Sequence, residues 1–191
     1  MTSIPKNAPL VYVSFSAEIN VSTAENLIAV MANCANEQVK QVYLLLSTPG
    51  GNVREGCNLY NVLRGMPFEL VTHNTGTVGS VGNAIFLAGS KRYGSRHSTF
   101  MFHGVGHTAQ QQQRFEQKDF EERLSALISE QKVIGSIITE HTKISESEIA
   151  ELFRQGQTKD SEFAVEKGII NEIRDVQIVA GCPVIALVFK R

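Results

Sequence analysis

The side chains of Ser80 and His103 could together support nucleophilic catalysis. Ser80 lies among small residues in the segment Gly79-Ser80-Val81-Gly82, and His103 closes a later apolar segment. A serine hydroxyl is barely ionised near neutral pH, so it becomes a nucleophile only when a base accepts its proton. Histidine titrates in the range that suits this task and can later pass the proton to a leaving group. The pair predicts a serine nucleophile with a histidine base; an ordinary serine in a tight strand-to-helix turn is the alternative.

Backbone N–H groups near this serine could stabilise a developing oxyanion. Gly50-Gly51 follows one predicted strand, and Val81 directly follows Ser80. Small residues at such places let the backbone and a substrate carbonyl approach closely. Removing one oxyanion donor from a serine enzyme costs about 2.7–4 kcal/mol of transition-state stabilisation. We therefore predict the N–H groups of Gly51 and Val81 as the oxyanion hole.

An α/β fold would bring these motifs to one edge of a sheet. Apolar and β-branched runs predict strands, and segments with helical spacing separate them. This alternation implies parallel strands with helical crossovers, whose carboxyl ends share the side where ligands bind. Gly50-Gly51, Ser80 and His103 each follow or end such a strand. The predicted strands are 10–15, 39–47, 69–73 and 98–103, with a last one at 184–189.

Capping patterns indicate where the helices begin. The segments Ser22-Thr23-Ala24-Glu25 and Ser145-Glu146-Ser147-Glu148 are capping boxes. Asp160 is expected to cap a short helix that ends at Gly168. A long helix is predicted from about residue 113 to 141, well above the usual 10–14 residues. It could pack on its own domain or extend as an arm against a second subunit, and the sequence leaves both open.

The composition is that of a globular protein that binds neither nucleic acid nor a membrane. The length of 191 residues suits a single domain over 1–191. A net charge of −1 counts against a nucleic-acid or anionic-membrane surface. No apolar run approaches the roughly 20 residues that a membrane span requires. No residue spacing predicts a metal site, and no cofactor motif is recognised.

The cysteines and the N-terminal residues predict a cytoplasmic protein. Cys34, Cys57 and Cys182 form an odd, widely spaced set that makes neither a zinc pattern nor a convincing disulfide framework. Residues 1–9 lack the hydrophobic region of a signal peptide. We therefore expect reduced cysteines and a cytoplasmic location.

In their order and spacing, these motifs resemble the proteolytic subunit of the Clp protease, within the crotonase-like superfamily. The resemblance covers roughly residues 10 to 175. It rests on Ser47-Thr48-Pro49-Gly50-Gly51-Asn52-Val53, on Gly79-Ser80-Val81-Gly82 and on Ser98-Thr99-Phe100-Met101-Phe102-His103. It implies the α/β spiral of that family, built from β-β-α and β-α units with mainly parallel strands and a long protruding helix.

The resemblance also implies a function. It assigns the nucleophile to Ser80, the base to His103 and the oxyanion hole to the N–H groups of Gly51 and Val81. The implied reaction is peptide-bond hydrolysis through an acyl-enzyme, without a cofactor, on peptides or unfolded proteins. The long helix resembles the handle through which two rings of identical subunits face each other, so we expect a homo-oligomer.

Three departures from the family pattern stand out. The family's catalytic aspartate falls on Gly156, so the acid is absent from its expected position. Asp160 is the nearest carboxylate and is expected either to serve as a displaced acid or only to cap its helix; without it, Ser80 and His103 form a dyad. The family's N-terminal axial loops have no counterpart before the first predicted strand, which counts against docking of an AAA+ unfoldase. The Gln-Pro that usually follows the base is replaced by Gly104-Val105.

The sequence therefore predicts a serine endopeptidase, with two alternatives. The missing acid at Gly156 favours a weak or inactive subunit that assembles with an active relative. A crotonase-like enzyme could use the same oxyanion hole on an acyl-coenzyme A thioester. The pairing of Ser80 with His103 argues against that second alternative, since such chemistry usually relies on carboxylates.

Overall fold

The computed structural model describes residues 4–106 and 116–189, and eight strands of these residues pair in one sheet. Their alternating or continuous apolar residues bury at least one face of each long strand. The strands are β1 Val11–Ser16, β2 Gln41–Thr48, β3 Glu69–Gly79, β4 Lys91–Gly94, β5 Thr99–Phe102, β6 Gln157–Lys159, β7 Glu172–Ile173 and β8 Val184–Leu187.

The sheet is parallel apart from one pair. Its order is β6-β5-β3-β2-β1-β8, while β4 pairs with β3 and with β7. The pairs β1–β2, β2–β3 and β3–β5 are parallel, and only β5–β6 is antiparallel among the described strands. The carboxyl ends of β2, β3 and β5 therefore share one edge, as the sequence predicts for the glycine pair, the serine and the histidine.

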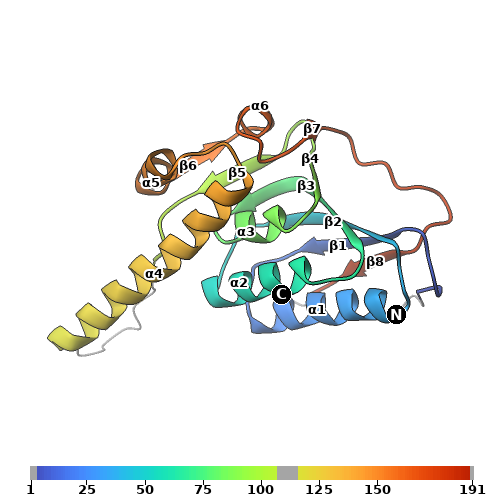
Figure 1. The fold of residues 1–191 in the computed structure, drawn as a ribbon, viewed down its shortest axis with the longest axis horizontal. Coiled ribbons are helices and arrows are strands. Elements are labelled where there is room, and N and C mark those ends of the chain that lie inside the picture. Colours follow the sequence, from blue (N-terminus) through green and yellow to red (C-terminus); the bar gives the residue numbers. More distant parts are fainter. Residues whose placement is uncertain (1–3, 107–115, 190–191) are drawn as a thin grey trace.

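Helices cover the sheet and one of them projects from it (Figure 1). α1 and α2 run side by side along one face, α5 and α6 lie near β6, and α4 extends away from the rest of the molecule. This arrangement confirms the predicted α/β fold with a long protruding helix. The helices are α1 Val21–Asn36, α2 Val53–Arg64, α3 Gly82–Leu87, α4 Gln117–His141, α5 Glu146–Gln155 and α6 Ser161–Glu166.

The core lies between the sheet and the helices that cover it. The apolar side chains of β2 that face α1 and α2, such as Leu44 and Leu46, are fully buried. Leu27 and Met31 of α1 and Leu59 of α2 are also removed from solvent. β2 is buried along most of its length, which explains why its residues are almost continuously apolar.

α4 changes character along its length. Ile134, Ile137 and Ile138 in its second half are buried, whereas Leu124 and Ile128 in its first half are 59% and 61% exposed. The predicted start near residue 113 lies outside the described residues. None of the described helices is both long and apolar enough to span a membrane.

The side chain of Arg92 ties the ends of three helices together. Its partly buried guanidinium donates hydrogen bonds to the carbonyl oxygens of Gly89, His141, Gly168 and Ile169, at 2.7–3.3 Å. These carbonyls lie at or just beyond the carboxyl ends of α3, α4 and α6, where helices leave acceptors without an internal partner. Arg92 therefore anchors the carboxyl end of the projecting helix to the sheet.

Three strands differ from the prediction. β3 continues through Gly79 rather than ending at His73, and the sequence predicts neither β4 nor β6. The small residues after His73 resemble a turn in sequence, but they remain extended because β3 exchanges one neighbour for another: residues 71–74 pair with β4 and residues 77–79 with β5. The short β4 contains two cations and gives no strand pattern.

The helix caps agree with the prediction at two places and differ at one. Ser145 accepts a hydrogen bond from the Glu148 N–H, and Asp160 accepts one from the Phe163 N–H, so both are N-caps as predicted. α1 begins earlier than its predicted box: Asn20 is its N-cap and forms a reciprocal pair of bonds with Thr23. Asparagine accepts from N3 as readily as serine does.

Candidate active site

Ser80 occupies a sharp turn between β3 and α3. Its φ of 54° lies in the left-handed region, which a residue with a side chain seldom adopts. The Ser80 N–H donates to the Met101 carbonyl of β5 at 2.9 Å, so the turn is fastened to the neighbouring strand. A strained serine between a strand and a helix is also the geometry of the nucleophile elbow in α/β-hydrolases.

The glycine pair after β2 lies directly against this serine. A Cβ on Gly50, whose φ is 99°, would lie 2.6 Å from the Ser80 Cβ and 3.3 Å from its Oγ. A Cβ on Gly51, whose φ is 145°, would lie 2.2 Å from the carbonyl oxygen of Ile19. Both positions therefore require glycine, and the requirement at Gly50 arises from the close approach to Ser80.

Two N–H groups beside Ser80 have no partner in the part of the chain that the structure describes. The Gly51 N–H donates to no described residue, although the Gly50 carbonyl and the Asn52 N–H on either side both bond to Ile19. The Val81 N–H also lacks a described acceptor, since α3 begins one residue later. Unpaired amides next to a serine hydroxyl can bind an oxyanion.

His103 follows the strand next to Ser80. Gly79 of β3 pairs with Met101 of β5, so Ser80 and His103 both continue from the same end of adjacent strands. Both residues are partly buried. Within residues 4–106 and 116–189, no hydrogen bond joins the Ser80 Oγ to the imidazole; such bonds are often long before a substrate binds.

The His103 ring is oriented by the backbone of the next residue, Gly104. Its Nδ1 lies 2.8 Å from the Gly104 carbonyl oxygen, and the Gly104 N–H donates to the Phe153 carbonyl at 3.0 Å. A carbonyl oxygen only accepts, so Nδ1 carries the proton and Nε2 of the neutral ring keeps its lone pair. This is the tautomer that a general base needs.

Gly156, where the sequence resemblance expects an aspartate, directly precedes β6. In the antiparallel pair β5–β6, Phe102 pairs with Gln157, so Gly156 and His103 each lie one residue past the last pair. Gly156 ends α5 with a φ of 64°, and a Cβ added to it would meet nothing within 4 Å. The position is therefore open and lacks only a side chain.

Asp160 lies at the far end of the same strand. Lys159 faces Phe100, so Asp160 falls beyond it, opposite Thr99. At roughly 3.3 Å per residue, that is about 13 Å along β5 from His103. The Asp160 carboxylate instead accepts a hydrogen bond from the Phe163 N–H at 2.9 Å. The structure does not bring Asp160 to the imidazole, and the residue has the alternative role of a helix cap.

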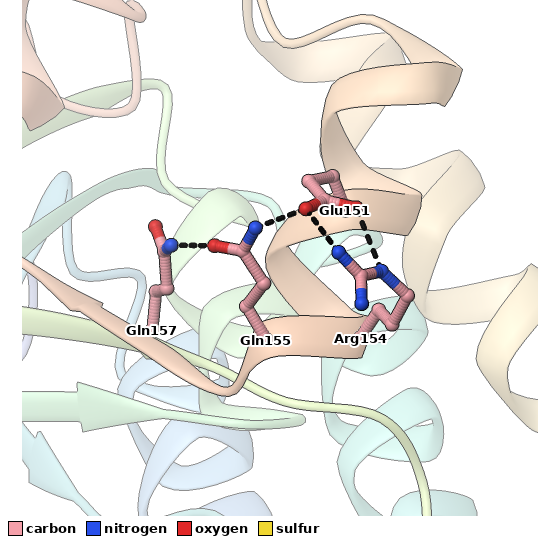
Figure 2. A network of polar contacts seen from close by, with 4 residues as sticks. All are labelled: Glu151, Arg154, Gln155 and Gln157. Atoms are coloured by element: carbon pink, nitrogen blue, oxygen red, sulfur yellow. Dashed lines mark hydrogen bonds and ion pairs between the residues drawn. The ribbon is translucent and has the colours of Figure 1, made fainter.

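The polar side chains around Gly156 bond to one another (Figure 2). Gln157 donates to Gln155, Gln155 donates to Glu151, and Arg154 forms a bidentate pair with the Glu151 carboxylate. The hydrogen bond from Arg154 lowers the pKa of Glu151 below its usual value. The nearest carboxylate before Gly156 in the sequence, Glu151, is thus used in a surface network.

A hollow of about 360 Å³ opens beside the glycine pair. Gly51 and Val53 line it on one side, and Val105 and Glu130 line it on the other. The hollow thus lies next to the unpaired Gly51 amide. Arg54 stands at its rim, with its Nε 3.7 Å from Glu130 Oε1.

Sequence reasoning missed two groups of this site. Asn83, one turn after Ser80, donates to the carbonyls of Ser80 and Met101 at 3.0 and 2.9 Å. The Gly104 carbonyl holds the His103 ring. An asparagine three residues after a candidate nucleophile is a weak sequence signal, and a backbone acceptor gives none.

The Clp protease family model matches residues 10–177, in agreement with the resemblance seen in the sequence. The ATP-dependent Clp protease proteolytic subunit 2 of Prochlorococcus marinus is 35% identical over 99 residues, half of each chain. The subunit of the same name from Treponema pallidum is 26% identical over 165 residues, which cover 83% of this chain and 79% of that one.

Among solved structures, a mutant of ClpP1 from Listeria monocytogenes has the same fold. The TM-score is 0.78 at 21% sequence identity, and the match covers 87% of this chain and 92% of the other. β8 lies beyond the residues that the family model matches. From the extent of the family match, this chain belongs to the Clp protease family.

Proposed function

We propose that this protein is a serine endopeptidase that cleaves peptide bonds through an acyl-enzyme on Ser80. The observation that carries the proposal is the packing of Gly50 against the Ser80 side chain, with the neighbouring Gly51 and Val81 amides unpaired. His103 follows the adjacent strand end, with Nδ1 bonded to a carbonyl. A nucleophile, a base and an oxyanion hole thus converge at one edge of the sheet.

Each group has one task in the reaction. His103 Nε2 takes the proton from Ser80 as its Oγ attacks the substrate carbonyl, and the Gly51 and Val81 N–H groups bind the resulting oxyanion. The imidazolium then gives its proton to the departing amine. Water, activated by the same imidazole, attacks the acyl-serine and releases the second product.

The Gly104 carbonyl takes over one part of the missing aspartate's role. It selects the tautomer of His103, but it carries only a partial negative charge and stabilises the imidazolium less than a carboxylate would. Changing the aspartate of one serine protease to asparagine lowered turnover by about 10⁴-fold. We therefore infer a Ser-His dyad of low intrinsic rate, without Asp160.

The open position at Gly156 also supports a second candidate, an inactive subunit that assembles with an active relative. The two candidates share a fold and differ only in whether Ser80 reacts. An inactive subunit would keep the glycine-lined turn without using it. The experiment below separates them.

The names of the relatives support proposals about substrates and partner proteins. They are proteolytic subunits of an ATP-dependent protease, so we infer peptide or unfolded-protein substrates and name an AAA+ unfoldase as a candidate partner. The exposed apolar side chains of α4 support assembly with further copies. The three cysteines are unpaired, which is consistent with the cytoplasm.

A fluorophosphonate probe, which phosphonylates activated serines, tests the proposal. The folded wild-type protein should be labelled on Ser80, and Ser80→Ala should remove both the label and the hydrolysis of a fluorogenic peptide. Ser95→Ala is the matched control, because Ser95 also contacts a histidine, with its Oγ 3.2 Å from His73 Nε2. This control should label like the wild type.

Two results would count against a peptidase. One is a wild-type protein that is folded by circular dichroism but remains unlabelled at high probe concentration, which would favour the inactive subunit. The other is labelling that survives in Ser80→Ala. Mass measurement of the labelled peptide identifies the modified residue in either case.

A further inference from the structure

The side chain of Asn83 crosses from the Ser80 turn to the strand that leads to His103. Its Nδ2 donates to the Ser80 carbonyl at 3.0 Å and to the Met101 carbonyl of β5 at 2.9 Å. Met101 also accepts the Ser80 N–H at 2.9 Å. Three hydrogen bonds therefore join the serine turn, the first turn of α3 and β5 at one place.

Only a primary amide of this length satisfies both partners. The Ser80 and Met101 groups are carbonyl oxygens, which accept but do not donate, so the side-chain atom facing them must carry two protons. An aspartate has no proton to give when ionised, and an apolar residue has none at all. The orientation of the Asn83 amide follows from these partners.

The other end of the amide is left without a partner. Asn83 is 2% exposed, and its Oδ1 is the one buried side-chain polar atom among the described residues that has no hydrogen bond. A buried unpaired acceptor is unfavourable, and in native proteins such groups are few and call for an explanation. For stability alone, an apolar residue here would avoid that cost.

The turn that Asn83 holds is itself strained. Ser80 has a left-handed φ, a conformation that persists only where surrounding contacts enforce it. The Asn83 backbone N–H already donates to the Ser80 carbonyl at 3.1 Å. The side chain therefore adds what the backbone does not, a link from that carbonyl to β5.

We propose that Asn83 is a positioning residue, which fixes the Ser80 turn relative to the strand that carries His103. This inference rests on the proposed serine-peptidase function. Asn83 does not touch the reacting atoms. It keeps the hydroxyl and the imidazole in register, and small displacements of such groups reduce rates strongly.

The variants Asn83→Ala and Asn83→Asp test this role. Each removes the two Nδ2 donors, and Asn83→Asp does so with almost no change of shape. Ile85→Val is the matched control, because Ile85 is fully buried in the same helix but has no polar group. The first measurement is the second-order rate of fluorophosphonate labelling at Ser80, together with kcat and KM for a peptide.

We expect labelling and kcat to fall by roughly 10- to 100-fold in Asn83→Ala, with KM nearly unchanged. The labelling rate and kcat of Asn83→Asp should fall at least as far. Ile85→Val should stay within about twofold of the wild type, because it leaves every hydrogen bond of the turn in place. The thermal unfolding midpoint of Asn83→Ala should change little, since the unpaired Oδ1 is removed with the donors.

Amide hydrogen exchange gives a second measurement that does not require catalysis. The Ser80 N–H, bonded to Met101, should exchange about tenfold faster in Asn83→Ala than in the wild type or Ile85→Val. The proposal would be overturned if Asn83→Ala showed the same labelling rate and the same exchange rate as the wild type. It would also be overturned if Ile85→Val lost as much labelling rate as Asn83→Ala. If the wild type is never labelled, the peptidase proposal fails, and the exchange rate alone then supports or overturns the role of Asn83.

Discussion

Gly156 leaves open space for a side chain next to the strand pair that leads to His103. It lies one step past the last β5–β6 pair, with no atom within 4 Å of a Cβ built on it. Its φ of 64° and ψ of 59° are left-handed, a region that aspartate and asparagine tolerate better than other residues with side chains. The site therefore has both the space and an accessible backbone conformation for a carboxylate.

Gly156→Asp should raise peptidase activity. A carboxylate near Nδ1 stabilises the imidazolium that forms during acylation, and we expect kcat/KM to rise by about tenfold or more. Gly156→Asn is the control: it has the same shape and the same backbone strain, but it lacks the charge. Equal rates for the two variants would mean that the carboxylate does not reach the ring.

For single residues, residue type and spacing were sufficient to predict where some of the candidate site residues lie in the fold. Ser80 follows a strand in a tight turn and Gly50 lies against it, as expected from small residues at strand ends. The sequence could not decide whether Asp160 is a displaced catalytic acid or a helix cap. A carboxylate just before a helix gives the same sequence pattern in both roles. The role inferred for Asn83 depends on the Met101 carbonyl, whose position only the folded sheet determines.

Between the strands, His73 forms part of a buried polar chain. Its Nδ1 lies 2.8 Å from the Tyr43 hydroxyl and its Nε2 lies 3.2 Å from the Ser95 hydroxyl, while Tyr43 and Tyr93 stack at 6.3 Å. His73 has no exposed surface. Burial lowers the pKa of His73 from 6.5 to about 4, because a charged ring is poorly solvated there.

This histidine should make the fold sensitive to acid. His73 takes up a proton near pH 6.5 in the unfolded chain but only near pH 4 in the folded chain. The contribution of neutral His73 to the free energy of unfolding is therefore fully present above pH 6.5 and is lost as the pH falls to 4. The loss is on the order of 3 kcal/mol. Urea unfolding of wild type and His73→Gln between pH 7 and 4 measures it.

The glutamine variant should show a smaller decline over that interval, because glutamine does not titrate. Its stability at pH 7 provides the reference for the lost ring contacts. Parallel pH curves for the two proteins would show that other groups cause the acid sensitivity.

The elements themselves were predictable where their patterns are long. β2 has a near-continuous apolar run, and α4 has an apolar stripe over many turns, so both were expected. β4, β6 and the second half of β3 were missed because their residues are small, polar or charged. Pairing with neighbours, which a local pattern does not contain, keeps these residues extended.

Across the whole molecule, the projecting helix presents an apolar surface. Leu124 and Ile128, one turn apart, are both largely exposed. They border a groove of about 580 Å³ that continues to Ile149 and Phe153 of α5. Exposed apolar groups over a groove are typical of protein contacts, and a second copy of α4 is our proposed occupant. Of the two possibilities that the sequence left open, this surface favours the arm.

Ile128→Glu should therefore weaken self-association. A carboxylate cannot enter an apolar contact without losing its hydration, so the assembly should dissociate at concentrations where the wild type remains associated. Sedimentation velocity measures the masses. Val133→Glu is the control: Val133 is 43% exposed on the same helix but does not line the groove. A monomeric wild type, or equal effects of both variants, would contradict an interface at the groove.

The pairing of β8 with β1 also bears on how the chain folds during synthesis. Tyr12 of β1 lies beside Val184 of β8, so the two partners are more than 170 residues apart in the sequence. β2, the other neighbour of β1, follows it after a single helix. On the ribosome, β1 can pair with β2 early, but its other edge stays unpaired until residues 184–187 of β8 emerge. During that interval β1 is an open sheet edge, which attracts strands of other nascent chains.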